Sequence, residues 1–154
     1  MTNTLILHRI LKAPRARVYE CWTTPEHMPH WFMPKPHFLT DITIDLRPGG
    51  AFNSTMHVDG NVFPSQGCVL DAVKDTKFVF TDLMSADFQP VATPGLGFTA
   101  TIELSDHHDG TVYHVTARHR TPEDTAKHEE MGFSKGWGIV ADQLEAYAAG
   151  LKGA

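Results

Sequence analysis

The chain has 154 residues, of which 42% are hydrophobic, 20% are charged and 10% are aromatic. This composition is typical of a single globular domain and excludes a disordered or fibrous chain. Lysine and arginine total 13 against 18 acidic residues, and the resulting net charge of −5 disfavours nucleic-acid binding, which depends on neutralising phosphates.

The beginning of the sequence predicts one strand followed by two short helices. Residues 5–11 are rich in leucine and isoleucine and predict a strand that ends before Pro14. Pro14 suits the first turn of a helix, where its missing N–H costs nothing, and residues 16–23 continue that helix. Pro25 opens a further short helical turn, and the prolines that follow prevent a long continuation.

The middle of the sequence predicts six strands, most of them joined by hairpins. Apolar residues recur at every second position, which is typical of a strand with one buried face. In the first of these strands we expect four apolar side chains to point inward: Phe38, Ile42, Ile44 and Leu46. The six predicted strands cover residues 38–47, 52–58, 62–73, 77–84, 96–104 and 112–120. Prolines and glycines make residues 86–97 a loop or irregular connection.

From Thr121 the pattern is helical to about Ala149, with Thr121 as the N-cap and Pro122 at the first helical position. Glycine inside a helix costs about 1 kcal/mol relative to alanine. Gly132, Gly136 and Gly138 therefore need a compensating role. Two interpretations remain open, close packing of the helix on a strand and a notch that faces a ligand.

These elements predict an α+β fold in which a curved antiparallel sheet of about seven strands wraps around the long C-terminal helix. The two short helices follow the first strand. A curved sheet meets a straight helix well along its middle and poorly near its ends. We therefore expect a space lined by apolar side chains between the sheet and the helix.

Several motifs distributed along the sequence support a family resemblance. Residues 22–26 read Trp-Thr-Thr-Pro-Glu, and residues 45–50 read Asp-Leu-Arg-Pro-Gly-Gly. Residues 80–82 read Phe-Thr-Asp, and residues 131–133 read Met-Gly-Phe, shortly before Gly136-Trp137. With these motifs the chain resembles the family related to the C-terminal domain of the activator of Hsp90 ATPase, in the START-like (Bet v 1-like, SRPBCC) superfamily. The resemblance covers nearly the whole chain, as one domain over residues 1–154.

The resemblance implies a helix-grip fold with a hydrophobic cavity between the sheet and the long helix. It does not imply one activity, because relatives include carriers of lipids and other hydrophobic molecules, polyketide cyclases, hormone receptors and the co-chaperone domain.

Twelve residues are our candidates for lining this cavity, most of them aromatic or methionine. They are Trp22, Trp31, Phe32, Met33, Phe52, Met56, Phe80, Asp82, Phe98, Met131, Phe133 and Trp137. Trp31, Phe32 and Met33 lie between prolines in an irregular segment, and soft methionine side chains adapt to varied apolar shapes. We expect these three residues to form the mouth or lid of the cavity.

The function expected from these residues is non-catalytic binding of a small hydrophobic molecule. An enzyme of cyclase or hydrolase type is one alternative, with Asp82, His119 or His128 as groups that could titrate in an apolar pocket. A second alternative is an interaction module that contacts a chaperone or another protein through the outer face of the sheet or through residues 86–97. The sequence leaves the oligomeric state open.

We expect no cofactor and no metal. In the best histidine cluster, His27 and His30 with His37 nearby, Pro29 breaks the helical register and no further ligand completes a set of four. His107 and His108 are expected to be solvated in a turn. His114 and His119 are five positions apart on a strand, so they should point to opposite faces and cannot chelate together.

The cysteines and the N-terminus favour the cytoplasm. Cys21 and Cys68 stand alone, without the spacing of a metal site, and residues 1–4 lack the pattern of a secretory signal. The longest apolar stretches are shorter than the ~18 residues that a membrane-spanning helix needs. We therefore expect no membrane span.

Overall fold

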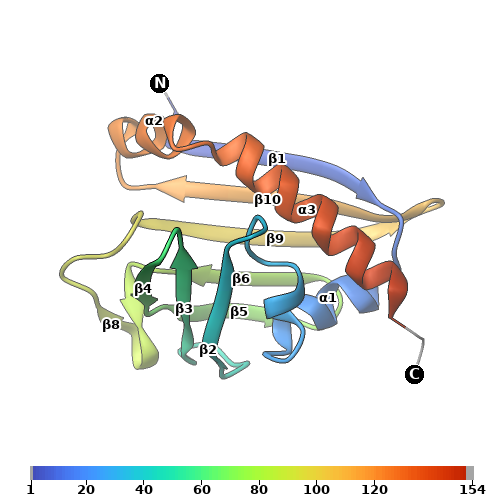
Figure 1. The fold of residues 1–154 in the computed structure, drawn as a ribbon, viewed down its shortest axis with the longest axis horizontal. Coiled ribbons are helices and arrows are strands. Elements are labelled where there is room, and N and C mark those ends of the chain that lie inside the picture. Colours follow the sequence, from blue (N-terminus) through green and yellow to red (C-terminus); the bar gives the residue numbers. More distant parts are fainter. Residues whose placement is uncertain (1, 152–154) are drawn as a thin grey trace.

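The computed structural model describes residues 2–151, which form an α+β fold (Figure 1). In chain order its elements are β1 (Thr4–Leu11), α1 (Arg15–Thr23), the 3-10 helix η1 (Met28–His30), β2 (Phe38–Ile44), β3 (Phe52–Val58), β4 (Asn61–Ser65), β5 (Cys68–Val73), β6 (Lys77–Thr81), β7 (Met84–Ser85), the 3-10 helix η2 (Ala86–Phe88), β8 (Gln89–Pro90), β9 (Phe98–His107), β10 (Gly110–His119), α2 (Pro122–Glu130) and α3 (Phe133–Gly150).

The strands are antiparallel and divide into three sheets. The largest has the order β1-β10-β9-β6-β5, the second has the order β2-β3-β4, and β7 pairs with β8. Figure 1 shows α3 running across the β1, β10 and β9 part of the large sheet, with β2, β3 and β4 beside it. The expectation of one curved sheet of about seven strands is therefore wrong in its detail, although the antiparallel arrangement is confirmed.

The second sheet arises because the strand expected over residues 62–73 is interrupted at Gly67. A Cβ atom on Gly67 would lie 2.8 Å from the carbonyl oxygen of Phe52 and 2.9 Å from that of Thr81. The backbone can pass between these two strands only without a side chain. On one side of this point β4 pairs with β3, and on the other side β5 pairs with β6.

β2 contains a bulge that changes which side chains face inward. Asp41 has φ 54°, and the pairing with β3 shifts register between Thr40 and Thr43. Leu39 is consequently buried, while Phe38 is 49% exposed and stacks on His57 with ring centroids 4.4 Å apart. The prediction that Phe38 points inward is therefore wrong, because an extra residue reverses the alternation along the strand.

Leu46, which we also expected on the inward side, lies beyond the end of β2 and is 45% exposed. Ile42 and Ile44 do pack against the core, partly buried. The inward side predicted for this strand is thus correct at Ile42 and Ile44 and wrong at both ends.

The C-terminal region forms two helices where one was predicted. Gly132 has φ 94°, a left-handed conformation that cannot continue an α-helix, and it is the N-cap of α3. Thr121 caps α2 as expected, since its side-chain oxygen accepts a hydrogen bond from the Asp124 N–H at 3.0 Å. Within residues 2–151, no helix is both long and apolar enough to cross a membrane.

The core lies between the large sheet and the helices α1 and α3. Trp22, Trp31 and Tyr113 are among its largest fully buried side chains. The Trp22 indole N–H donates to the Tyr113 hydroxyl at 3.1 Å, and the Trp31 indole N–H donates to the Cys21 carbonyl at 3.2 Å. Both indole groups are thus satisfied inside the core, which fixes the orientation of their rings.

Candidate functional site

The structure gathers most of the predicted cavity residues into one aromatic cluster centred on Trp22 of α1. The Trp22 ring lies 4.9 Å from Trp31, 5.5 Å from Phe32, 5.6 Å from Phe80 and 6.2 Å from Trp137, measured between ring centroids. Further ring contacts extend the cluster to Phe52, Phe98 and Phe133. These residues come from α1, α3, the segment after η1 and strands of two sheets, so only the folded chain assembles the cluster.

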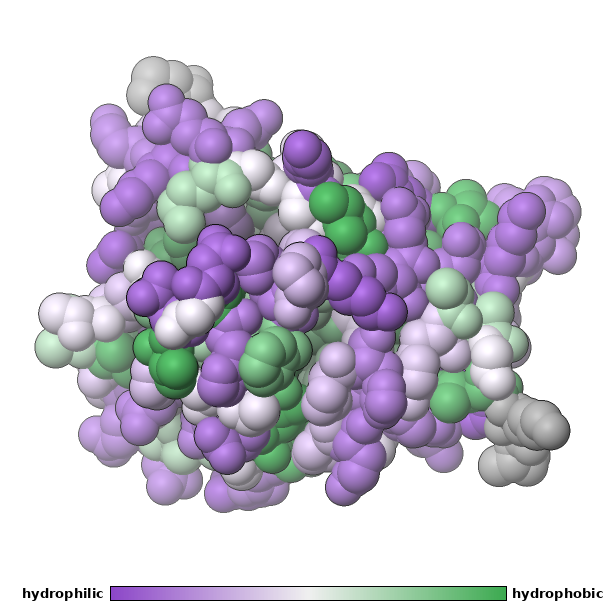
Figure 2. All heavy atoms as spheres, viewed as in Figure 1, coloured by the Kyte–Doolittle hydropathy of each residue, from purple (hydrophilic) through white to green (hydrophobic). Residues whose placement is uncertain are grey.

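The members of this cluster differ in burial. Trp22, Trp31, Phe80 and Phe133 are buried. Four members pack against the core but keep part of their surface accessible, namely Phe32, Phe52, Phe98 and Trp137, and the same holds for the two predicted methionines Met33 and Met56. Figure 2 shows apolar side chains reaching the surface over β2, between polar ones. The partly buried set is therefore the part of the cluster that a ligand could contact.

Two predicted residues differ from what we expected of them. Met131 caps the end of α2 and is 63% exposed, because the helix break at Gly132 leaves it on the surface. Trp31, expected at the mouth of the cavity, is 1% exposed and belongs to the core. Of the three residues between the prolines, only Phe32 and Met33 are partly accessible.

Gln143 on α3 holds this irregular segment in place. Its side-chain amide donates to the carbonyl oxygens of Trp31 at 2.9 Å and Met33 at 2.8 Å, and its oxygen accepts from the Lys35 N–H at 3.3 Å. The sequence offered no signal for this role, because a glutamine on a helix is usually solvated.

The two glycines inside α3 have different surroundings. A Cβ atom on Gly138 would lie 2.7 Å from a guanidinium nitrogen of Arg9, so this glycine permits close packing. A Cβ atom on Gly136 would meet nothing within 4 Å. Gly136 precedes Gln143 by seven residues, or two helical turns, and so lies on the side of α3 that faces the segment held by Gln143. The close-packing interpretation is therefore wrong for Gly136, which borders open space.

Asp82 has a structural role. One carboxylate oxygen accepts hydrogen bonds from the Leu96 N–H at 2.9 Å and the Gly97 N–H at 3.0 Å, and the other accepts from the Phe98 N–H at 2.9 Å. This carboxylate fixes the start of β9 and with it the position of the Phe98 ring.

His119 and His128 form a buried pair next to the cluster. His119 Nε2 and His128 Nδ1 are 2.8 Å apart, and the His128 ring lies 4.9 Å from Phe98 and 5.0 Å from Phe133. Burial lowers the pKa of His128 to about 4, with a further contribution from His119. His128 is therefore neutral at pH 7.

The other histidines serve different contacts. His27 lies 2.6 Å from the Tyr147 hydroxyl and 3.0 Å from Glu20. His107 and His108 stack in the turn between β9 and β10, where their ligand atoms and those of Asp109 lie within 4.8 Å of one another on the surface.

His114 pairs with His8 on the outer face of the large sheet, whereas His119 is buried, which confirms that the two residues face opposite ways.

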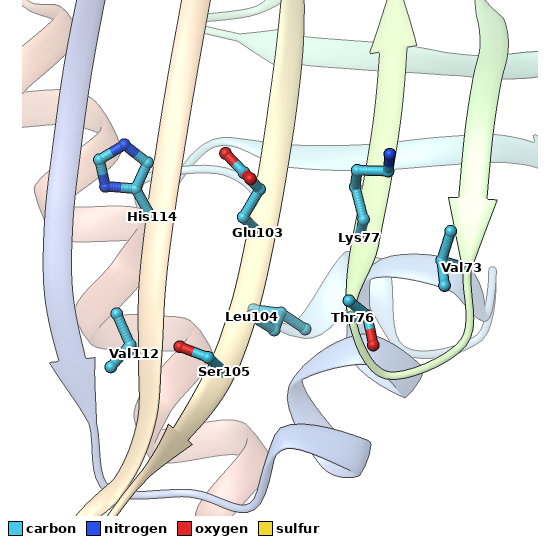
Figure 3. A pocket seen from close by; sticks show the side chains of 8 residues that line it. All are labelled: Val73, Thr76, Lys77, Glu103, Leu104, Ser105, Val112 and His114. Atoms are coloured by element: carbon cyan, nitrogen blue, oxygen red, sulfur yellow. The ribbon is translucent and has the colours of Figure 1, made fainter.

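Two open hollows also form on the surface. One, of about 560 Å³, lies on the outer face of the large sheet, where Figure 3 shows His114, Glu103 and Lys77 side by side on neighbouring strands. The other, of about 570 Å³, lies beside α1 near Tyr19 and Asp75. Neither hollow lies between α3 and the large sheet, so neither coincides with the aromatic cluster.

A C-terminal helix packed on antiparallel strands, with an aromatic cluster between them, defines an α+β protein of the class that includes ligand-binding and co-chaperone-like proteins. The sequence model described as "Activator of Hsp90 ATPase homolog 1-like protein" matches residues 12–149. The chain belongs to this family, which confirms the resemblance found in its motifs.

Solved structures agree with this assignment. A protein from Nitrosomonas europaea is 39% identical with a TM-score of 0.90, and the match covers 94% of this chain and 92% of that one. A protein from Mycobacterium smegmatis is 23% identical with a TM-score of 0.79, covering 99% and 94%. An AHSA1-like protein from Aeromonas hydrophila is 18% identical with a TM-score of 0.74, covering 98% and 96%. No curated protein matches this chain.

Proposed function

We propose that the protein binds a small hydrophobic molecule, without catalysis, in the space beside Gly136 and Trp137 on α3. The observation that carries this proposal is a set of aromatic side chains that are only partly buried, among them Trp137 beside Gly136, where a Cβ atom would meet nothing within 4 Å. A helix tolerates a glycine there at a cost of about 1 kcal/mol relative to alanine, although no neighbouring group requires it. Room for a bound molecule accounts for this cost.

The chemistry of the accessible side chains supports the hydrophobic character of the ligand. Phe98 and Trp137 present aromatic surface, and Met33 and Met56 are soft enough to adapt to different apolar shapes. Each 100 Å² of apolar surface removed from water contributes roughly 2.5 kcal/mol to binding before the entropic cost of association. A ligand of modest size therefore gains its affinity from this surface.

The proposal is tested by filling the space. Isothermal titration and thermal unfolding are measured with a panel of fatty acids, aromatic hydrocarbons and polyketide-like compounds. We expect at least one class to bind and to raise the melting temperature. The Gly136→Leu variant should lose this binding by tenfold or more because its side chain occupies the space.

Gly150→Leu is the matched control, since position 150 lies in the same helix and also borders open space, but at the exposed end of α3. It should bind like the unmodified chain. Equal binding by Gly136→Leu, or no binding of any compound by the unmodified chain, would contradict the proposal.

Contact with another protein is a second candidate, favoured by exposed apolar side chains. Phe38 and Val62 are about half exposed on the outer face of the β2–β4 sheet, and Phe88 is similarly exposed within residues 86–97. A pull-down at physiological salt, with Phe38→Ser and Phe88→Ser as test variants, checks this candidate. Retention of the same partner by both variants would contradict it.

We further propose that the protein works in the cytoplasm. Cys21 and Cys68 are both buried and unpaired, and burial raises the pKa of the Cys21 thiol to about 12, which keeps it protonated and unreactive.

A further inference from the structure

The buried histidine pair has a defined order of hydrogen bonds. The Asn3 carbonyl oxygen accepts from the His119 backbone N–H at 2.7 Å and lies 3.0 Å from His119 Nδ1. A carbonyl oxygen can only accept, so Nδ1 of His119 must carry the hydrogen. Whenever the His119 imidazole is neutral, its other ring nitrogen bears a lone pair, so His119 Nε2 is an acceptor in that form.

This order fixes the tautomer of His128. His128 Nδ1 lies 2.8 Å from His119 Nε2, and it must donate because His119 Nε2 accepts. Neutral His128 has one ring N–H, which this bond uses. Nε2 of His128 is thus an unprotonated acceptor at the opposite edge of the ring.

This acceptor has no hydrogen-bond partner among residues 2–151, although His128 is only 5% exposed. Every fully enclosed side-chain nitrogen or oxygen among these residues has a hydrogen-bond partner. Because Nε2 of His128 has none, it is not fully enclosed and keeps contact with open space. The His128 ring packs against Phe98 and Phe133, and both of these contact Trp137. His128 therefore lies at the margin of the aromatic cluster, and its Nε2 is the one ring nitrogen of the histidine pair without a partner in the described part of the chain.

We propose that Nε2 of His128 accepts a hydrogen bond from a hydroxyl group of the bound molecule, so that the ligands are apolar molecules carrying a hydroxyl, such as phenols. This inference rests on the proposed function and names the polar group by which the same site selects its ligand. Water can reach Nε2 only through a small opening, and a ligand hydroxyl that takes the place of this water makes the same hydrogen bond while the rest of the ligand packs on apolar side chains. A few polar groups of this kind usually determine specificity in an apolar site.

The same geometry disfavours carboxylates and plain hydrocarbons. A carboxylate at pH 7 has no hydrogen to donate to a lone pair, and the negative charge of Asp82 is close enough to act on His128. A hydrocarbon or an ether leaves Nε2 unpaired.

The experiment compares three compounds with the same ring system, 2-naphthol, 2-methoxynaphthalene and 2-naphthoate, by isothermal titration at pH 7. We expect 2-naphthol to bind about tenfold more tightly than its methyl ether, since one hydrogen bond separates them. The naphthoate should bind more weakly than the ether. In ¹⁵N NMR spectra, Nε2 of His128 should be unprotonated in the free protein and should shift on adding 2-naphthol alone.

The variant His128→Asn keeps a side-chain N–H near the position of Nδ1 and lacks the Nε2 acceptor. It should bind the naphthol and the ether equally, while far-UV circular dichroism checks that it folds. His128→Gln can place an amide oxygen near the position of Nε2 and should restore part of the preference. The comparison in the unmodified chain decides the question even if both variants are unstable.

The outcomes separate the two proposals. If the ether binds as tightly as the naphthol, or the naphthoate binds most tightly, the role of His128 is overturned and hydrophobic binding stands. If none of the three binds and the wider panel also fails, the proposed function itself is overturned.

Discussion

At the scale of single residues, the buried His128 couples stability to pH. Its pKa is about 4 in the folded chain, against an ordinary value of 6.5. As the pH falls below 6.5, His128 of the unfolded chain binds a proton, whereas His128 of the folded chain binds one only near pH 4. Stability is therefore complete above pH 6.5 and is lost as the pH falls through this window, by about 3 kcal/mol.

Urea unfolding at pH 7 and pH 4.5 measures this loss. His128→Asn should lower stability at pH 7 and show a smaller decrease on acidification, because the group that titrates is gone. An identical decrease in both chains would show that the carboxylates alone cause it.

The sequence could identify residue types for the site, but it could not assign their roles. Trp22 and Trp137 were identifiable because both lie on the apolar faces of predicted helices. The partners of Asp82 depend on the loop conformation of residues 95–98, which no residue pattern encodes. The role of His128 depends on the Asn3 carbonyl, more than a hundred residues away in the sequence.

At the scale of elements, two glycines four residues apart should respond oppositely to alanine. Gly132 has φ 94°, which is strained for any residue with a Cβ atom, so Gly132→Ala should lower stability by more than about 1 kcal/mol. Gly136 has helical backbone and an open side-chain direction, so Gly136→Ala should raise stability by about 1 kcal/mol. Thermal and urea unfolding of the two variants check the signs. The same sign for both would contradict the helix break.

The break between α2 and α3 could not be located from the sequence. The apolar spacing from Phe133 onward is helical on its own, and the capping pattern at Thr121 is equally valid for a short helix. Glycine at 132 fits either a costly interior position or a left-handed end. Only the backbone angle distinguishes them.

At the scale of the whole molecule, the two larger sheets are joined where the chain passes Gly67. Gly67→Ala would place a Cβ atom within 3 Å of the carbonyl oxygens of Phe52 and Thr81, and backbone cannot move aside as a flexible side chain can. We expect this variant to lose about 2 kcal/mol or more of unfolding free energy. Gly136→Ala serves as the control, since the same change there meets nothing. A neutral Gly67→Ala variant would contradict the tight crossing.

This division into sheets also marks a limit of sequence patterns. Alternating apolar residues look the same whichever sheet a strand joins, so residues 62–73 read as a single strand. The change of partner at Gly67 depends on contacts with Phe52 and Thr81, which belong to other strands. The antiparallel arrangement of the strands was predictable because hairpin turns and apolar periodicity are local properties.

The chain contains three tryptophans, and all of them belong to the aromatic cluster. Trp31 and Trp137 lie 4.9 Å and 6.2 Å from Trp22, distances at which excitation energy passes readily between indole rings. Indole emission from this protein therefore originates at one place and carries no background from distant parts of the fold. Tryptophan fluorescence should therefore respond to a ligand that binds beside α3.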